Sequence, residues 1–400
     1  MKYIVILGDG WADYPDKNGD TPLSLANKPN IDMLARKSLC GLCKTVPDGM
    51  KPGSDVANMS VMGYDPKKYY TGRSPLEASS MGIDLSCDDV TYRCNLVTLS
   101  GEGAYENLVM EDYSAGEIDT LTAGRIIAEL NEKMVLPEGW ELYPGVSYRH
   151  CLVHRNASTG AILTPPHDIS GRNITDYLPS GEVGKTLLEF QKKSMEILKA
   201  SPINAERASS GKNPANSCWF WGEGTRPSFT SFKTLYGLSG AVISAVDLVK
   251  GLGKVAGMDS IDVEGACGTL HTNFKGKAEA TLEAIKDHDF VYLHMEAPDE
   301  CGHQGDKPGK VRSIEMIDEL VVKPIYEEMT RRGERFKLLI TPDHPTPLSL
   351  RTHVSDPVPF VLYDSGKDVH GVESYSEKSV MVTRVLFNSG VEMFGEFLKG

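Results

Sequence analysis

Short apolar runs that alternate with longer amphipathic stretches limit the fold of this 400-residue chain more than any other feature of its sequence. Consecutive apolar residues are typical of a strand that is buried on both faces of a sheet. The predicted strands lie at 2–7, 240–245, 289–295, 336–340 and 358–363, and the later predicted helices at 246–256, 276–287, 309–330 and from about 377. Because strands alternate with helices, the sheet should be mostly parallel, as in α/β proteins.

The chain is longer than one ordinary hydrophobic core requires, so two domains are expected. The pattern changes at about residue 96, where strands and helices become interleaved with Gly- and Pro-rich turns, and it returns at Gly240. We therefore predict an inserted domain at 96–237 and a discontinuous core made of 1–95 and 238–400.

Carboxylate and imidazole side chains stand in four places, three of which directly follow a short apolar run. They are Asp9, the pair Asp299 and His303, the adjacent residues Asp343 and His344, and His353. Ligands of open α/β sheets bind at the carboxyl ends of the strands, so these groups are expected to converge on one cleft. Such ligands suit Mn²⁺, Zn²⁺ or Co²⁺ better than Ca²⁺, and two ions can clamp both sides of a phosphoryl transfer. Around the first pair, Pro298, Gly302 and Gly305 predict a loop.

Ser54 follows a Lys51-Pro-Gly turn and precedes a largely apolar run, Val56 to Met62, that can begin a helix. Such a turn exposes backbone N–H groups and the positive end of the helix dipole, which suits a phosphate. If a nearby group removes its proton, Ser54 is a candidate nucleophile, and the metal-type ligands elsewhere favour that hypothesis. The alternative is that Ser54 is only the N-cap of the helix.

The predicted insertion offers cationic and polar groups for an anionic substrate. The candidates are Arg149, His150 and Arg155 near a strand, His167, Asp168 and Arg172 in a turn, and Arg226 beside aromatic residues. Arginine binds carboxylate or phosphate through two hydrogen bonds, so at least one anion contact is expected here. Lys250 in the core is a further candidate, although it also fits a solvated position on a helix.

The composition argues against several classes of partner. A net charge of −13 without a long basic run disfavours nucleic acid, and no apolar stretch reaches the ~18 residues that would span a membrane. The eight cysteines are scattered, and the one CxxC spacing, Cys40 to Cys43, falls in a predicted strand, so we expect core thiols rather than zinc or redox chemistry. With no signal peptide visible, we expect a cytoplasmic protein, either a monomer or a small homo-oligomer.

Several motifs together resemble those of the cofactor-independent phosphoglycerate mutases, more closely their archaeal-type branch within the alkaline phosphatase superfamily. These motifs are Gly53-Ser-Asp, Gly63-Tyr-Asp-Pro, Tyr70-Thr-Gly-Arg, the Asp299/His303 segment, Asp343-His344 and His353. The resemblance implies an α/β, alkaline-phosphatase-like core with a doubly wound, mostly parallel sheet and an inserted α+β cap domain. It also implies two divalent metal ions, with Mn²⁺ ahead of Zn²⁺, Co²⁺ or Mg²⁺, and no bisphosphoglycerate.

The same resemblance implies that Ser54 becomes phosphorylated while 2- and 3-phosphoglycerate are interconverted, a reaction of glycolysis and gluconeogenesis. One metal would be held by Asp9, Ser54, Asp343 and His344, and the other by Asp299, His303 and His353. A small phosphorylated substrate would be gripped by Arg149, His167, Asp168 and Arg226 as the cap closes and excludes water.

Two other hypotheses are compatible with the sequence. One is a related phosphotransferase or phosphatase, for example an enzyme that phosphorylates homoserine, because Trp219, Trp221 and Glu223 differ from the usual cap sequence of the family. The other is a non-enzymatic acidic scaffold, in which the Asp and His residues are only caps and core groups. Binding of divalent metal separates the second from both enzymes.

Overall fold

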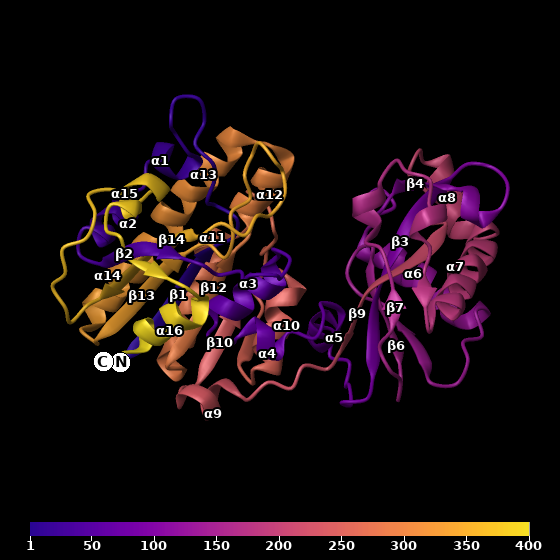
Figure 1. Ribbon diagram of the computed structural model, residues 1–400, viewed down its shortest axis with the longest axis horizontal. Coiled ribbons are helices and arrows are strands. Elements are labelled where there is room, and N and C mark those ends of the chain that lie inside the picture. The colour runs from indigo at the N-terminus through magenta and orange to yellow at the C-terminus, as the bar shows by residue number, and fades with distance from the viewer. Residues whose placement is uncertain (400) are drawn as a thin grey trace. The chain divides into compact units, whose positions relative to one another are not determined.

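The structure, a computed structural model, describes residues 1–399 and consists of two compact units (Figure 1). Unit 1 contains Met1–Tyr70 and Phe229–Gly400, and unit 2 contains Thr71–Ser228. These boundaries differ from those expected from the sequence, which placed the inserted domain at 96–237. The reason is that strand β3 (Val90–Ser100) runs without a break through the expected boundary and belongs as a whole to unit 2.

Unit 1 is built on a sheet of eight strands within residues 1–399. In spatial order they are β11 (Asp259–Ile261), β10 (Gly240–Ile243), β12 (Phe290–Met295), β1 (Lys2–Gly8), β13 (Phe336–Thr341), β14 (Val358–Asp364), β2 (Leu39–Cys43) and β15 (Leu386–Phe387). Among these strands, all except β14 run in the same direction. The predicted α/β class and mostly parallel sheet are therefore confirmed.

Helices cover both faces of this sheet. They are α1 (Pro22–Leu25), α2 (Pro29–Ala35), α3 (Ser54–Val61), α4 (Pro66–Tyr69), α9 (Phe232–Tyr236), α10 (Asp247–Val255), α11 (Phe274–Asp287), α12 (Ala297–Gln304), α13 (Lys307–Ile317), the π-turn Asp318–Val322, α14 (Lys323–Arg332), α15 (Glu377–Met381) and α16 (Gly390–Leu398). Tyr3 of β1 contacts Phe397 of α16, with ring centroids 5.5 Å apart. Phe336, which pairs with the preceding residue of β1, contacts Tyr326 of α14 at 6.3 Å. Consecutive side chains of a strand point to opposite faces of the sheet, so α16 and α14 lie on opposite faces. Helices on both faces make the sheet doubly wound.

Unit 2 is an α+β unit with a five-stranded antiparallel sheet, counted within residues 71–228. Its strands are β3, β4 (Val109–Asp112), β5 (Trp140–Tyr143), β6 (Arg149–His154) and β9 (Ser217–Thr225), with a separate small pair β7 (Ala161–Ile162) and β8 (Ser180–Gly181). Its helices are α5 (Ser74–Ser80), α6 (Thr120–Lys133), α7 (Gly184–Lys199) and α8 (Pro202–Ser209). Apolar side chains of β3, α6 and α7, such as Leu96, Ile126 and Leu187, form its main core.

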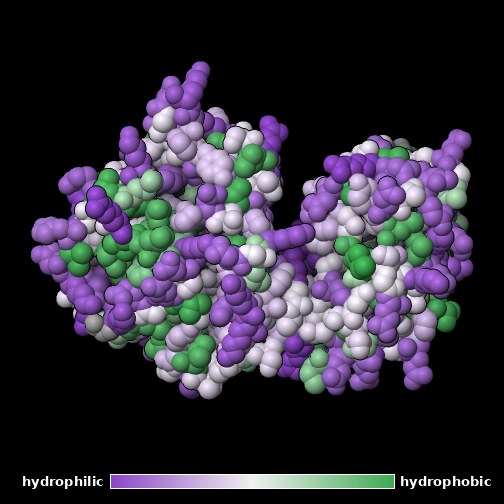
Figure 2. Space-filling view, viewed as in Figure 1, coloured by the Kyte–Doolittle hydropathy of each residue, from purple (hydrophilic) through white to green (hydrophobic). Residues whose placement is uncertain are grey.

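The surface carries mostly polar side chains. The space-filling view shows hydrophilic residues over most of the visible face, as the net charge of −13 leads one to expect (Figure 2). Exposed apolar side chains include Met381, Val382 and Leu386 near the edge strand β15. Within residues 1–399, no helix combines the length and the apolar character needed to cross a membrane.

Candidate active site

The candidate site lies at the carboxyl edge of the unit 1 sheet. Leu7 of β1 pairs in parallel register with His294 of β12 on one side and with Thr341 of β13 on the other. The segments that leave these three strands therefore start side by side, and they bring Asp9 and Asp343 together. This is the edge at which parallel α/β sheets bind ligands, as the sequence pattern predicted.

A first cluster consists of Asp9, His294 and Asp343, all buried. Each offers one ligand atom, and these atoms lie within 4.8 Å of one another. The Asp343 carboxylate accepts three hydrogen bonds, from the Gly10 N–H at 3.2 Å, the Asn58 amide at 2.7 Å and the His344 N–H at 2.9 Å. Asp9 and Asp343 were expected from the sequence, whereas His294 was not. A signal existed, because a histidine inside an otherwise apolar buried strand needs a polar partner.

A second cluster consists of Asp299, His344 and His353, whose ligand atoms also lie within 4.8 Å of one another. His303 joins it, since His303 Nε2 is 3.2 Å from Asp299 Oδ2 and 2.9 Å from His353 Nε2. His344 Nε2 lies 3.3 Å from Asp343 Oδ2 and 3.6 Å from Asp9 Oδ1, so this imidazole stands between the two clusters. The structure thus brings together all the metal-type residues that the sequence suggested.

Asp299 and His303 are presented by a helix, α12, and the expected loop is wrong. Pro298 lies in the first turn, where no intrahelical N–H bond is lost, and Gly305 takes the left-handed conformation that ends the helix, with φ of 72°. Gly302 has a different purpose, because a Cβ there would lie 2.8 Å from the Thr346 carbonyl oxygen. The helix places Asp299 and His303 four residues apart on one face.

Ser54 is the first residue of α3, and its hydroxyl faces the clusters. Its Oγ lies 3.1 Å from His344 Nε2. The N-cap of the helix is Gly53, so the interpretation of Ser54 as a mere N-cap does not hold. Asn58, one turn later, donates to both the Ser54 carbonyl oxygen and Asp343 Oδ2, at 2.8 and 2.7 Å, and so ties the serine to the first cluster.

The protonation of His344 follows from its other neighbours. The Thr346 hydroxyl donates its single proton to Asp299, so toward His344 Nδ1, 3.3 Å away, its oxygen can only accept. The Thr346 oxygen therefore favours a proton on Nδ1, and in that tautomer the lone pair of Nε2 faces Ser54. Burial lowers the pKa of His344 to about 4, which keeps the ring neutral near pH 7.

The two clusters fit divalent cations. Asp9 Oδ1 and His294 Nε2 are buried, and neither makes a hydrogen bond of good geometry within the described residues, although His294 Nε2 lies 3.0 Å from Asp9 Oδ2. The pKa of Asp9 is raised well above its usual value, mainly by burial and then by the carboxylates of Asp343 and Asp299. Without a cation, a charged Asp9 carboxylate is therefore unfavourable at this position. Carboxylate and imidazole donors in two adjacent sets match the preference of borderline divalent ions.

A buried lysine holds the loops of the site. The Lys310 ammonium donates to Asp13 Oδ2 and to the Thr346 carbonyl oxygen, both at 2.8 Å, and to the Ala12 carbonyl oxygen at 3.3 Å. Its side chain is wholly buried. Lys310 was not among the predicted site residues, because a lysine within a helical pattern gives no signal of burial.

In unit 2, three of the predicted substrate-binding residues lie around one aromatic cluster, formed by Tyr113, Tyr148, His167 and Trp221. The Arg149 guanidinium lies over the Tyr148 ring at 5.0 Å, and Asp168 lies 3.6 Å from His167. Arg93, which the sequence analysis missed, lies 4.1 Å over the Trp221 ring and is paired with Glu77 at 2.8 Å.

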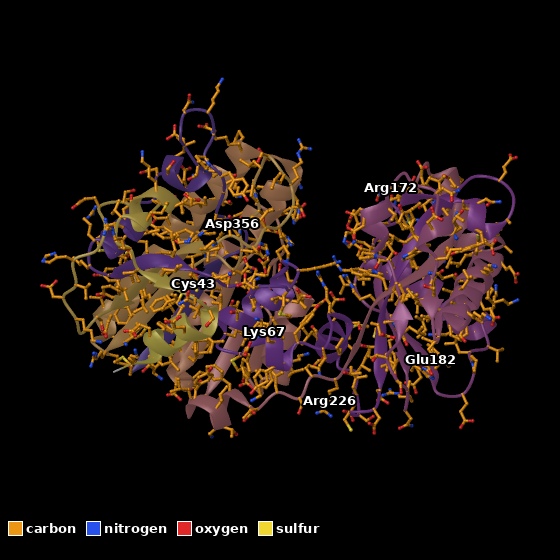
Figure 3. The ribbon with its side chains drawn as sticks, in the orientation of Figure 1. Cys43, Lys67, Arg172, Glu182, Arg226 and Asp356 are labelled. Carbon is orange, nitrogen blue, oxygen red and sulfur yellow. The ribbon has the colours of Figure 1, made fainter. Side chains whose placement is uncertain are left out.

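The other predicted candidates lie elsewhere, and Arg155 is paired with Asp89 and Glu141. His150 is buried, and its Nδ1 accepts a hydrogen bond from the Gly145 N–H at 3.0 Å. Arg226 donates to the Leu85 carbonyl oxygen at 2.7 Å. Figure 3 shows Arg226 and Arg172 at opposite ends of unit 2, so the predicted cationic groups do not form one site. Lys250, in unit 1, is paired with Asp262 at 2.6 Å.

The buried His150 leads to a prediction about stability and pH. Burial lowers its pKa from 6.5 to about 3, with a further contribution from Arg149. Between pH 6.5 and 3, His150 therefore binds a proton in the unfolded chain but stays neutral in the folded protein. The free energy of unfolding, which is at its full value above pH 6.5, decreases as the pH falls toward 3. The loss is about 1.4 kcal/mol per pH unit for one such group.

In His150→Asn the amide oxygen can still accept from Gly145, but nothing titrates. We expect denaturant unfolding in the presence of chelator to show a smaller loss of stability between pH 7 and pH 5 than in the unmodified protein. The exposed His271 provides the control variant His271→Asn, which should behave like the unmodified protein. Equal pH dependence of all three proteins would contradict the assignment.

The residues that suggested a different substrate have structural partners. Both oxygens of Glu223 accept the Gly160 N–H, at 3.2 and 2.9 Å, and one also accepts the Ala161 N–H. Trp219 is fully buried and donates to the Thr164 carbonyl oxygen, and Trp221 donates to Asn95. All three side chains are therefore engaged in contacts within unit 2.

Comparison with known proteins adds an independent observation. A protein-family model described as 2,3-bisphosphoglycerate-independent phosphoglycerate mutase matches residues 35–204. Proteins of that name from Methanothrix thermoacetophila and Methanosarcina barkeri are 51% and 49% identical over 95% of this chain, and the matches cover 95% and 94% of their own lengths.

Two solved structures resemble the whole chain. A protein from Pyrococcus horikoshii aligns with a TM-score of 0.81 at 29% identity, over 99% of this chain and 96% of its own. A structure titled cofactor-independent phosphoglycerate mutase, from Thermoplasma acidophilum, aligns with a TM-score of 0.63 at 25% identity, over 100% and 99%.

Proposed function

Because the chain belongs to the 2,3-bisphosphoglycerate-independent phosphoglycerate mutase family, we propose that it interconverts 2- and 3-phosphoglycerate through a phosphoserine at Ser54. The observation that carries the proposal is the position of the Ser54 hydroxyl, 3.1 Å from His344 Nε2 and beside two clusters of metal-type ligands. A phosphoryl group can leave one substrate hydroxyl, rest on Ser54, and return to the other hydroxyl. The sum of the two transfers needs no second phosphorylated compound.

The residues of the chain prepare Ser54 as a nucleophile. The proton of its hydroxyl is directed toward Nε2 of the neutral His344. Ser54 begins α3, where the positive end of the helix dipole favours negative charge on Oγ. Asn58 holds the serine backbone, and the Tyr292 hydroxyl in turn donates to Asn58 at 2.7 Å. The nucleophile is thus fixed before the substrate binds, which favours the reaction.

Two divalent ions are part of the proposal, with Mn²⁺ as the first candidate. Asp9 and Asp343 would hold one, Asp299, His303 and His353 would hold the other, and His344 lies between the two sets. Such ions neutralise phosphate oxygens and lower the pKa of a bound hydroxyl. Bound ions would also offset the burial and the repulsion from Asp343 and Asp299 that together raise the pKa of Asp9.

The proposal is tested with purified protein that is stripped of metal and reloaded with Mn²⁺. Given 3-phosphoglycerate and no bisphosphoglycerate, it should form 2-phosphoglycerate at ordinary enzyme rates, about 1–10³ per second. A parallel panel contains other phosphoesters and homoserine with a phosphoryl donor. Turnover of a panel compound without mutase activity would overturn the proposal. Homoserine phosphorylation is not favoured, because the relatives at about half identity are named as mutases and the cap departures are structural.

A separate prediction concerns the substrate-binding residues of unit 2. Arg149 is half-buried beside the Tyr148 ring, in a place that suits a carboxylate of the substrate, whereas Arg226 is engaged with a backbone carbonyl. We expect Arg149→Ala to lower mutase turnover about 10–100-fold, the effect of losing a hydrogen-bonded charge pair, and to raise the share of phosphate lost to water. The measurements are product formation and free phosphate, with metal content unchanged.

The matched control is Arg226→Ala. The sequence predicted the same effect for both arginines, but the structure supports it only for Arg149, so the control should keep its mutase activity. If Arg149→Ala retains full activity without added hydrolysis, or loses metal, Arg149 does not bind the substrate.

A further inference from the structure

His294 lies in the penultimate position of β12, in the middle of the sheet, and its side chain is fully buried. Its Nε2 points into the first cluster, 3.0 Å from Asp9 Oδ2 and near the ligand atom of Asp343. Within the described residues this nitrogen makes no hydrogen bond of good geometry, although the Asp9 carboxylate lies close to it. A buried polar atom without a well-formed contact is costly, so a group that completes its contacts is expected.

The other nitrogen of the ring is held by an acceptor. His294 Nδ1 lies 3.2 Å from Glu296 Oε1 and 3.0 Å from the Ser244 hydroxyl, which itself donates to Glu296 at 3.0 Å. A carboxylate and a hydroxyl that has given its proton away can only accept, so Nδ1 carries a proton. Metal-ligating histidines almost always donate their second ring N–H to a carboxylate or carbonyl in this way.

A buried ion pair stands behind this contact. The ammonium of Lys277 pairs with Glu296 and donates to the His294 carbonyl oxygen at 3.1 Å, and both side chains are buried. Such pairs are costly to desolvate, and they contribute little net stability compared with apolar residues. Here Lys277 already neutralises Glu296, so the carboxylate can orient His294 without requiring a cationic imidazole.

We propose that His294 Nε2 is a direct ligand of the ion held by Asp9 and Asp343, and that Glu296 and Lys277 position the His294 ring. This inference rests on the metal centre proposed above. The resemblance to the mutases implied no ligand from this strand.

The competing role of His294 is an imidazolium paired with Asp9. Burial lowers the pKa of His294, but Asp9 and Glu296 outweigh burial and raise it to about 10 in the protein alone. The two roles exclude each other in the loaded protein, because a protonated Nε2 has no lone pair.

Two variants separate the nitrogens of the ring. In His294→Asn the amide can still donate to Glu296 from near the Nδ1 position, but nothing replaces Nε2. The control variant is His288→Asn. His288 belongs to the same unit but contacts Asp259, away from both clusters. Calorimetric titration of the metal-free full-length chain with Mn²⁺ should show one of two sites weakened at least about 10-fold in His294→Asn and unchanged in His288→Asn. Circular dichroism shows whether each variant is folded.

Weaker binding alone would also fit an indirect effect on Asp9, so the decisive measurement detects the bond. The full-length chain is labelled with isotopic nitrogen in its histidine rings and loaded with an NMR-active cadmium isotope. We expect a cadmium-coupled ring nitrogen in the unmodified protein and in His288→Asn that is missing from His294→Asn. The same coupled nitrogens in all three proteins would overturn the inference while leaving the metal centre intact. If no ring nitrogen couples in any of them and Mn²⁺ does not bind, the proposed metal centre itself fails.

Discussion

Ser54→Ala should abolish interconversion of the phosphoglycerates while the protein stays folded and keeps its metal. The expected loss of turnover is on the order of 10⁶-fold, as when the nucleophilic serine of a hydrolase is removed. The physical reason is that, among residues 1–399, the hydroxyl that lies beside His344 Nε2 is that of Ser54, and without it the phosphoryl group has no residue to which it can be transferred. Stability should change little, because Gly53 and not Ser54 is the N-cap of α3.

Ser231 provides a matched control for this variant. It is the N-cap of α9, with its hydroxyl accepting from the Thr234 N–H, so Ser231→Ala should lose about 1 kcal/mol of stability and keep its activity. Rapid acid quenching of the unmodified protein during turnover, followed by mass spectrometry, should place one phosphoryl group on the peptide that contains Ser54. Full turnover by Ser54→Ala, or a phosphoryl group on another residue, would contradict the mechanism.

Removal of divalent metal should eliminate turnover completely and lower the melting temperature, and added Mn²⁺ should restore both. A ligand present at about 1,000 times its dissociation constant stabilises the folded state by about 4 kcal/mol per site. A comparable loss is expected on chelation, because Asp9, Asp343 and Asp299 then face one another without a cation. Activity and thermal unfolding are measured on the same samples before chelation, after it, and after reloading.

The comparison with other ions shows whether the effect is specific. Zn²⁺, Co²⁺ and Mg²⁺ are tested at equal free concentration, and Ca²⁺ serves as the ion that this donor set should bind poorly. Protein that turns over 3-phosphoglycerate at its full rate in excess chelator would rule out a metal-dependent reaction. A melting temperature unaffected by chelation would show that the two clusters do not bind ions.

Much of the core was predictable from sequence because its local patterns agree with its tertiary structure. The apolar runs at 2–7 and 336–340 became the buried strands β1 and β13, and the candidate ligand Asp343 lies just after the second of them. The α12 helix was not predicted because Pro298, Gly302 and Gly305 were interpreted as helix breakers. In the structure Pro298 lies in the first turn, Gly305 ends the helix, and Gly302 allows the close contact with Thr346.

The remaining site residues depend on contacts between distant segments. His294 shows no ligand spacing with a neighbour in sequence, and its proposed role depends on Asp9, which the sheet brings to it from a distant strand, as well as on Glu296 two residues later. The substrate-binding candidates of unit 2 were harder still, because an arginine in or next to a strand looks the same in sequence whether it stacks on a tyrosine, as Arg149 does, or bonds a carbonyl, as Arg226 does. Sequence supplies the type of such a residue but not its neighbours.

The contacts of Lys310 affect how the loops that carry Asp9 and Asp343 become ordered when the chain folds. One ammonium joins the loop after β1 to the loop after β13, although Ala12 and Thr346 are separated by most of the sequence. These loops therefore acquire their shape when α13 docks, as part of the same cooperative transition as the sheet. The entropy of ordering them is lost in folding, so an arriving cation meets a rigid site, and amide hydrogens of both loops should exchange as slowly as those of the core.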